Sequence, residues 1–452
     1  MSPTAIFRLI YSFYLASFLW NFYLTLRQYN VYRKAETRPE EVSGIISKED
    51  FETARNYNLD KMLFDFYEIA FGKTLTTIFQ SVLFILLSSI IETMIELPFS
   101  FYETFYVGQK HGFNNETVPF FFQDRAKKFF LNLLISSTLV AAVVWIVHWG
   151  GQYFYIYVWA FVSAFIFLMM FIYPEFIAPL FDKYTPLPES ELKTKIEALA
   201  NQVEFPLKKI YVVEGFKRSS HSNAYFYGFL KNKRIVLYDT LLSEEMNEKL
   251  KQADQKTETE TTTEDGNDTK TTKPETSEGE TTAGIDLATN GDEQHKHSLG
   301  MTDDEIVAVL GHELGHWSEY HSMWMLIATE LNIFVLLFVF GFLHRQPNLY
   351  LAFGFPASAQ QPALIGILLV SQYVFAPYNE LMSVAMNFVT RRFEFGADAF
   401  AARLGFVSQL CTGLVKLSRD NLSLPINDWL YSACNHSHPQ ILERLEALKK
   451  FK

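Results

Sequence analysis

The residues best placed to do chemistry are His312 and His316, which belong to a short H-E-x-x-H pattern. Two residues four positions apart on an α-helix lie on the same face, so both imidazoles can reach one metal ion. Glu313 lies beside them, where its carboxylate can take a proton from a water molecule on the metal. Because so short a pattern also occurs by chance, its value depends on a third ligand and on the elements around it.

A catalytic zinc site takes three protein ligands and leaves one position for water. We expect the third ligand to be Glu394, in the segment 393–398 (F-E-F-G-A-D). On one helix Glu394 and Asp398 face the same way, so Glu394 can bind the metal while Asp398 accepts the second ring N–H of a ligand histidine. In the alternative, both carboxylates are surface charges and Glu394 pairs with Arg391.

Four other histidines compete for a role at this site. His321 follows His316 by one turn and one residue, so we expect it to point away from the ligand face. His344 ends an apolar run and is expected at a membrane interface. His436 and His438 lie far along the chain, but that distance does not exclude them from the site.

Six apolar runs are each about long enough to cross a hydrocarbon layer of ~30 Å. They cover residues 5–25, 75–98, 128–149, 153–175, 322–343 and 362–385. Helices of soluble proteins rarely run for about twenty apolar residues without a charge, so the runs predict an integral membrane protein. The first run has no clear cleavage site, and we expect it to be a retained helix.

The charge of the chain excludes one class of partner. The net charge is −11, but residues 251–300 hold twelve Asp or Glu and five Lys, which is −7, and the rest is near −4. This balance argues against a nucleic-acid-binding protein. Two cysteines, Cys411 and Cys434, form neither a disulfide framework nor a metal motif, and we expect reduced thiols facing the cytosol.

The predicted fold is mainly α, a polytopic bundle of membrane helices with a small α/β domain. We divide it into six parts. The first three are an N-terminal transmembrane region (1–175), a soluble segment with a short sheet (176–250) and a disordered acidic insertion (251–300). The last three are the H-E-x-x-H helix (301–321), two transmembrane helices (322–385) and a C-terminal segment with Glu394 (386–452).

Local signals place the elements within these parts. Ser190 opens an amphipathic helix, and three strand-like runs follow it. The runs are Lys209–Val213, His221–Tyr227 and Arg234–Tyr238. Thr302 begins a capping pattern for the H-E-x-x-H helix, and Gly405 stops the helix that carries Glu394. Residues 57–74 have apolar positions at helical spacing, so we expect a helix that leads into the second membrane run.

A family resemblance strengthens the prediction. The segment 309–317 (V-L-G-H-E-L-G-H-W) resembles the zinc helix of the type I CAAX prenyl proteases, the membrane zinc endopeptidases of the a-factor-converting family. Four further segments resemble the same family, and together they run from about residue 175 to the end, apart from the insertion. They are 217–226 (K-R-S-S-H-S-N-A-Y-F), 233–241 (K-R-I-V-L-Y-D-T-L), 394–405, and His438-Pro439 with Glu443-Arg444.

The resemblance implies one zinc ion per chain and further site residues. A strand containing Asn223, Ala224 and Tyr225 would hold an extended peptide by strand addition, with the Asn223 side chain on the peptide backbone. His438 and Arg444 would approach the zinc and stabilise the oxyanion. The alternative makes the last two a helix cap and a surface cation.

The resemblance also implies an activity and a compartment. Glu313 would pass a proton from water to the leaving amine as the enzyme removes the C-terminal tripeptide of a farnesylated CAAX protein or cuts further upstream. The protein would lie in the endoplasmic reticulum membrane, or also the inner nuclear membrane, with the protease domain and C-terminus in the cytosol. The ending 449–452 (K-K-F-K) resembles a di-lysine retrieval signal.

The number of membrane helices departs from the family, which has seven helices around a chamber. The chain shows six apolar runs, and the shortfall lies near residues 70–75. The 26–74 segment carries eight Lys or Arg, which favours the cytosol, yet three runs separate it from a soluble domain expected on the same side. Either the chain lacks one chamber helix, or the 57–74 helix partly substitutes for it.

Two other functions compete with CAAX processing. One is a membrane quality-control protease that clears stalled or misfolded chains, because no motif in the sequence recognises the lipid. The other is an inactive scaffold that binds prenylated or membrane proteins without cutting them. The presence of all the expected catalytic residues disfavours the scaffold.

Overall fold

The computed structural model describes residues 3–451 with several gaps. The gaps are 36–37, 40–41, 43, 76–83, 216–222, 229–231, 253–299, 344–345, 355–365 and 367–368. Most of the predicted acidic insertion therefore lies outside the described residues, as do the start of the 217–226 segment and His344.

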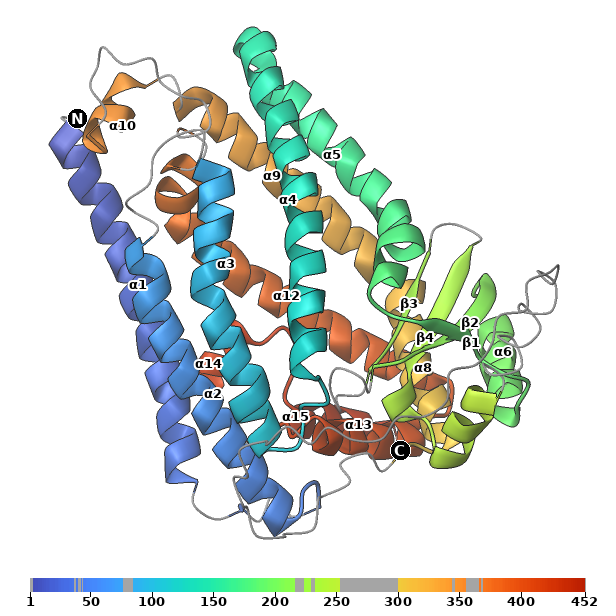
Figure 1. Cartoon of the computed structure of the whole chain (residues 1–452). Helices are drawn as coiled ribbons and strands as arrows, with labels where there is room; N and C mark the ends of the chain where they lie inside the picture. The colour runs from blue at the N-terminus through green and yellow to red at the C-terminus, as the bar shows by residue number, and fades with distance from the viewer. Residues whose placement is uncertain are drawn as a thin grey trace, which may run out of the picture.

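Seven long helices dominate the described part of the chain (Figure 1). They are α1 (Pro3–Lys34), α2 (Lys48–Leu75), α3 (Phe84–Tyr102), α4 (Val118–Trp149), α5 (Phe154–Ile172), α9 (His321–Leu343) and α12 (Ala376–Arg403). From α1 to α5 each helix packs against the next, and α5 packs against α9. A π-helical turn, Val370–Val374, contacts both α9 and α12, and α12 packs against α1, so the contacts close a ring.

Helix α2 is a long helix that the six apolar runs in the sequence do not reveal. The prediction covered only 57–74, whereas α2 has 28 residues and begins at Lys48. At ~1.5 Å per residue its length is about 42 Å, which is enough to cross a layer of ~30 Å. Of the two alternatives for the seventh helix, the structure agrees with the one in which this segment takes its place.

The connection between α1 and α2 lies at the same end of the molecule as the C-terminal segment. Val42 and Phe51 share an apolar cluster with Leu422. Beside this cluster, Nη2 of Arg27 lies 2.6 Å from Oδ2 of Asp428. If α2 to α5 all cross the membrane, four helices separate this connection from the soluble segment, and both lie on one side. The conflict in the six-run topology then disappears.

Three helical segments in the described residues are long and apolar enough to cross a membrane. They are Val118–Val147, Gly151–Leu180 and His321–Leu343, and they coincide with the predicted runs at 128–149, 153–175 and 322–343. The other three predicted runs include residues that the structure does not describe fully. As membrane spans, those three stay predictions.

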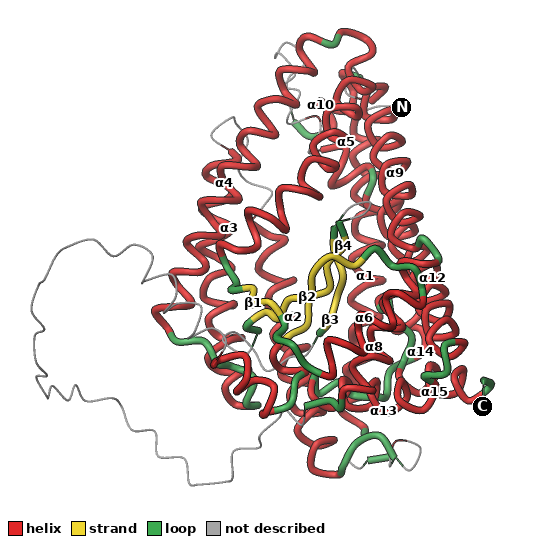
Figure 2. Tube along the Cα trace, turned by 90° about the vertical axis from the view of Figure 1, so that its right-hand side faces the viewer, coloured by secondary structure: helices red, strands yellow, loops and turns green. Residues whose placement is uncertain are grey.

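A small mixed sheet lies beside the helices (Figure 2). Its spatial order is β1 (Tyr184–Pro186), β2 (Leu207–Val213), β4 (Lys233–Tyr238) and β3 (Ala224–Tyr227). β2 and β4 are parallel, and the two outer pairs are antiparallel. The three predicted strands are present with shifted ends, whereas β1 was not predicted, because three residues that include a proline give no strand signal.

Helix α8 (Asp303–Ser318) carries the H-E-x-x-H pattern and lies at the centre of the soluble part. The sheet and α6 (Glu191–Gln202) pack on one side of it, and α12 and α13 (Val407–Asp420) pack on the other. Since protein covers it on both sides, α8 is buried over most of its length. The predicted capping pattern is a complete capping box between Thr302 and Glu305.

The remaining elements are short. They include the 3₁₀ turn Gly151–Tyr153, the π-helical turns Glu103–Gly108 and Tyr173–Ile177, the 3₁₀ turns Ala178–Leu180 and Asp239–Leu241, a helical stretch at 244–252, and the helices α10 (Pro347–Ala352), α14 (Trp429–Asn435) and α15 (Ile441–Lys449). The predicted helix start at Ser190 is confirmed, since its side chain accepts a hydrogen bond from the backbone N–H of Lys193. Helix α12 ends beside Gly405, as expected, and this glycine has a positive φ of 90°.

The seven-helix topology predicts which exposed positions share a side of the membrane. In a chain without its native cysteines, Glu49→Cys, Thr117→Cys and Lys450→Cys should all react with an impermeant thiol reagent from the same side of a sealed vesicle. Gln152→Cys, in the turn between α4 and α5, should react only from the opposite side, and it serves as the control. Reaction of Glu49→Cys from the Gln152 side would contradict a membrane-crossing α2.

Candidate metal centre

The predicted ligands come together because α8 and α12 pack closely at Gly315. A Cβ added to Gly315 would lie 2.9 Å from Cα of Ala397 and 3.1 Å from its carbonyl oxygen. Real Cβ atoms do not approach a backbone this closely, so only glycine permits the contact. His312 lies one turn before Gly315 on α8, and Glu394 lies one turn before Ala397 on α12. The close contact of the two helices therefore brings His312 and Glu394 face to face.

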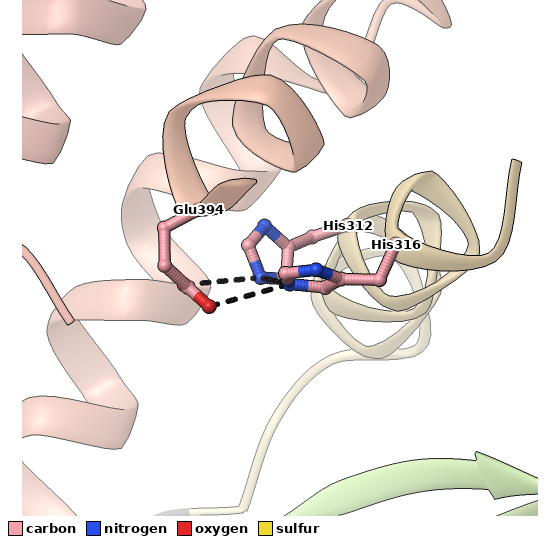
Figure 3. Close-up of side chains that lie close together, drawn as sticks. All are labelled: His312, His316 and Glu394. Carbon is pink, nitrogen blue, oxygen red and sulfur yellow. Dashed lines mark hydrogen bonds and ion pairs between the residues drawn. The ribbon is translucent and has the colours of Figure 1, made fainter. Parts of the chain in front are cut away.

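Three side chains meet in a triangle of ligand atoms (Figure 3). The Nε2 atoms of His312 and His316 are 3.2 Å apart. Oε2 of Glu394 is 3.5 Å from Nε2 of His312, and its Oε1 is 3.3 Å from Nε2 of His316. In a tetrahedral site with zinc–ligand bonds of ~2.0–2.1 Å, ligand atoms lie about 3.3–3.4 Å apart. The distance between the two imidazoles, and the distance from each imidazole to the nearer carboxylate oxygen, are close to that spacing.

The donor set also fits zinc chemically. Among the described residues, Oε2 of Glu394 is a buried atom without a hydrogen-bond partner, although it lies 3.5 Å from Nε2 of His312. Buried lone pairs that converge in this way cost free energy unless a cation satisfies them. Two histidines and one glutamate form a donor set that catalytic zinc sites use, so the residues present are suited to hold the ion.

Asp398 and Arg444 support His312 from behind. Oδ1 of Asp398 lies 2.9 Å from Nδ1 of His312, and Arg444 donates to both carboxylate oxygens at 2.6 and 2.8 Å. Burial by itself raises the pKa of Asp398, but its bonds to Arg444 and His312 outweigh burial and hold this pKa below its usual range. The ionised carboxylate keeps the His312 proton on Nδ1, so Nε2 faces the triangle.

The structure excludes the surface alternatives for Glu394 and Arg444, because both are buried. Arg391 pairs instead with Glu443, at 2.7 Å. Arg444 is bound to Asp398, and its Nη1 lies 3.5 Å from Oε2 of Glu394. Its guanidinium therefore supports ligand geometry, and its expected contact with an oxyanion stays a prediction.

His438 lies at the open side of the triangle. Its Nε2 is 3.3 Å from Oε1 of Glu394, and its side chain is 68 % exposed. Nδ1 of the same ring lies 3.0 Å from the hydroxyl of Ser437. Since it is both exposed and next to the ligands, His438 is placed where a side chain could contact a substrate.

Glu313 has the properties of a general base. Burial raises the pKa of its carboxyl, and the neighbouring His312 and His316 lower it in part. The net direction is upward, which makes the ionised form a stronger base. The side chain comes from the same turn of α8 as the two ligand histidines.

As expected, His321 does not belong to the ligand group of the described residues, but it contacts His316 on the other ring nitrogen. The residue is buried, and its Nδ1 lies 3.0 Å from Nδ1 of His316. The expectation assumed continuous helical spacing, but α8 ends at Ser318, and Tyr320 has a left-handed φ of 57°. This turn breaks the spacing and returns His321 to the end of α8.

The predicted peptide-binding residues lie on β3, which is an edge strand. Within the described residues β3 pairs only with β4, and α8 packs against it. Asn223 is exposed at the start of the strand, where its side chain accepts a hydrogen bond from the N–H of Ala224. Ala224 is buried, and the hydroxyl of Tyr225 lies 3.3 Å from that of Tyr184.

The contact at Gly315 makes a prediction about zinc affinity. The Gly315→Ala methyl group would overlap the backbone of Ala397, and such overpacking costs about 1–3 kcal/mol. Since ~1.4 kcal/mol is tenfold in an equilibrium constant, zinc affinity measured by chelator competition should fall by about fivefold to 100-fold. Gly311→Ala is the control, because its nearest neighbours are side-chain atoms, Phe406 at 3.3 Å and Cβ of Ala401 at 3.7 Å. Equal zinc affinity in the two variants would contradict the prediction.

Comparisons with known proteins agree with this geometry. Residues 28–79 and 71–183 match a family model described as CAAX prenyl protease N-terminal, five membrane helices, and residues 186–452 match peptidase family M48. The CAAX prenyl protease 1 homolog of Caenorhabditis elegans is 42 % identical, covering 100 % of this chain and 99 % of the relative. The homolog of Homo sapiens is 40 % identical, with 96 % of this chain and 93 % of the relative covered.

A solved structure agrees as well. The crystal structure of S. mikatae Ste24p superposes with a TM-score of 0.77 at 32 % identity and covers 98 % of both chains. The match therefore includes the helical ring as well as the soluble part. Together these findings show that the chain is a multi-pass membrane protein of the CAAX prenyl protease 1 family, within the M48 zinc metallopeptidases.

Proposed function

We propose that this chain is an endopeptidase that removes the C-terminal tripeptide of farnesylated CAAX proteins and also cuts further upstream. The observation that carries the proposal is the zinc-sized triangle of His312, His316 and Glu394, which lies next to the edge strand β3. Full-length relatives named CAAX prenyl protease 1 homolog give the substrate class.

The catalytic chemistry follows from the positions of the side chains. His312, His316 and Glu394 would hold one zinc ion per chain, and a bound zinc ion supplies a Lewis acid that activates the scissile carbonyl and the attacking water. Glu313 takes the proton from that water and delivers it to the leaving amine. His438 donates a hydrogen bond to the oxyanion from the open side of the triangle.

The edge of β3 orients the substrate. An extended peptide can pair with the backbone of Ala224 and Tyr225, because an edge strand has hydrogen-bonding groups available along one side. The exposed amide of Asn223 adds a contact to the peptide backbone at the end of the strand. Since α8 packs against β3, a peptide held there would lie beside the helix that carries Glu313.

We further propose an orientation in the endoplasmic reticulum membrane, with the protease part and the C-terminus facing the cytosol. The 26–74 segment has eight Lys or Arg, and positive charge near membrane helices favours the cytosolic side. The apolar cluster of Val42, Phe51 and Leu422 supports one side for this connection and the C-terminal segment. Prenylated substrates mature on that side.

Glu313→Gln separates metal binding from proteolysis. The amide is nearly the same size as the carboxylate but cannot take a proton, so zinc content measured by atomic emission should equal that of the wild type. The cleavage rate of a farnesylated CAAX peptide should fall by at least about 100-fold, the scale of a lost general base. Retained activity would refute the assigned role.

A matched pair of peptides tests the substrate class. The purified zinc-loaded protein should cleave a farnesylated CAAX peptide and leave its unprenylated twin largely uncut, as followed by mass spectrometry of the released tripeptide. Equal cleavage of both peptides would favour the quality-control protease. Cleavage of neither, from protein that retains zinc, would favour the scaffold.

A further inference from the structure

A series of hydrogen-bonding groups leads outward from His316. Its Nδ1 lies 3.0 Å from Nδ1 of His321, and Nε2 of His321 lies 3.2 Å from Oε2 of Glu319. Oε1 of Glu319 accepts a hydrogen bond from Nη2 of Arg403 at 3.0 Å. His321 is buried, whereas Glu319 and Arg403 reach the surface. The series therefore connects a metal-site residue with the solvent-facing end of α8.

Only one arrangement of protons satisfies this series when Nε2 of His316 faces the triangle. Nδ1 of His316 must then carry the ring proton and donate a hydrogen bond to Nδ1 of His321. His321 consequently has its own proton on Nε2, which donates to the carboxylate of Glu319. Each imidazole is thereby fixed in one tautomer.

The ring of His321 is held in place by stacking. It lies parallel to the ring of Phe393, with centroids 4.1 Å apart and an angle of 13° between the planes. Phe393 directly precedes Glu394, so the same segment of α12 that supplies the third ligand also fixes His321.

The backbone conformation near His321 also favours the contact between His321 and His316. Tyr320 has a φ of 57°, a left-handed conformation that is costly for a bulky side chain and that places His321 over the end of α8. On α12, a Cβ at Gly396 would lie 2.6 Å from Oε2 of Glu319. Glycine at this position leaves the space that the carboxylate occupies.

The two ligand histidines thus have equivalent support. His312 donates directly to Asp398, which is held by Arg444. His316 donates through a second imidazole to another carboxylate–arginine pair. Outer hydrogen bonds of this kind orient the ring of a metal ligand and typically contribute about 10–100-fold to metal affinity.

We propose that His321 and Glu319 are positioning residues, which fix the tautomer and ring orientation of His316 for zinc binding. The proposal rests on the zinc site proposed above and assigns no contact between these residues and substrate. Loss of the His321 ring would leave Nδ1 of His316 without this acceptor, and the imidazole could then rotate away from the triangle.

The test compares His321→Ala, His321→Asn and a matched control, His111→Ala. His111 is also a buried histidine beside a carboxylate, with Nε2 3.5 Å from Oδ2 of Asp60, and it packs edge-on against Tyr57. Zinc affinity is measured by chelator competition, and ligand geometry by the absorption spectrum of the cobalt-substituted protein. Both readouts are independent of substrate.

His321→Ala should bind zinc about 10–100-fold more weakly and change the cobalt spectrum. His321→Asn should recover part of the affinity, because its amide oxygen lies near the position of Nδ1. His111→Ala should match the wild type. Wild-type affinity and spectrum in His321→Ala would overturn the proposal.

Glu319→Ala keeps the proposal testable if His321→Ala does not fold, because the Glu319 side chain is 34 % exposed and tolerates truncation better. It should also weaken zinc binding, and unchanged affinity would overturn the proposal. Failure of the wild-type protein to bind zinc would refute the proposed function itself, whereas wild-type binding with unaffected variants would refute only the role of His321 and Glu319.

Discussion

The close contact between α8 and α12 is the constraint on which the rest of the structure depends. Gly315 lets the backbones approach until Glu394 reaches two histidines on the facing helix. The sheet and α6 hold α8 from one side, and α13 holds it from the other. Helix α12 also packs against α1 in the helical ring, so the metal centre forms where the membrane part and the soluble part share one helix.

The buried charged groups around this contact are paired with one another. Burying a carboxylate is costly unless it is paired, and Asp398 is bound by Arg444 and His312 at once. A similar arrangement backs His316 through His321 and an ion pair nearer the surface. Two outer hydrogen-bonding systems thus orient the two imidazoles that a zinc site needs, and Glu394 completes the triangle between them.

Regular spacing along single helices made the metal ligands predictable from the sequence. Contacts that depend on breaks in that spacing, or on packing between distant segments, were not predictable. Spacing along single helices suffices for His312, His316 and the pair Glu394 and Asp398, and the capping box marks the start of α8. Helix α2 was missed as a long helix because charges such as Asp60, which pairs with Lys110, interrupt its apolar pattern. The contact of His321 depends on the left-handed Tyr320, and the Arg444–Asp398 pair depends on distant packing, and neither leaves a local signal in the sequence.

X-ray absorption at the zinc edge of the purified protein tests the central claim most directly. The account predicts one zinc ion per chain, bound at ~2.0–2.1 Å by two imidazole nitrogens and by oxygen. In Glu394→Gln the two-imidazole signature should remain while the oxygen contribution changes. Sulfur ligands, a shell without imidazole, or a Glu394→Gln spectrum identical to the wild type would contradict the account.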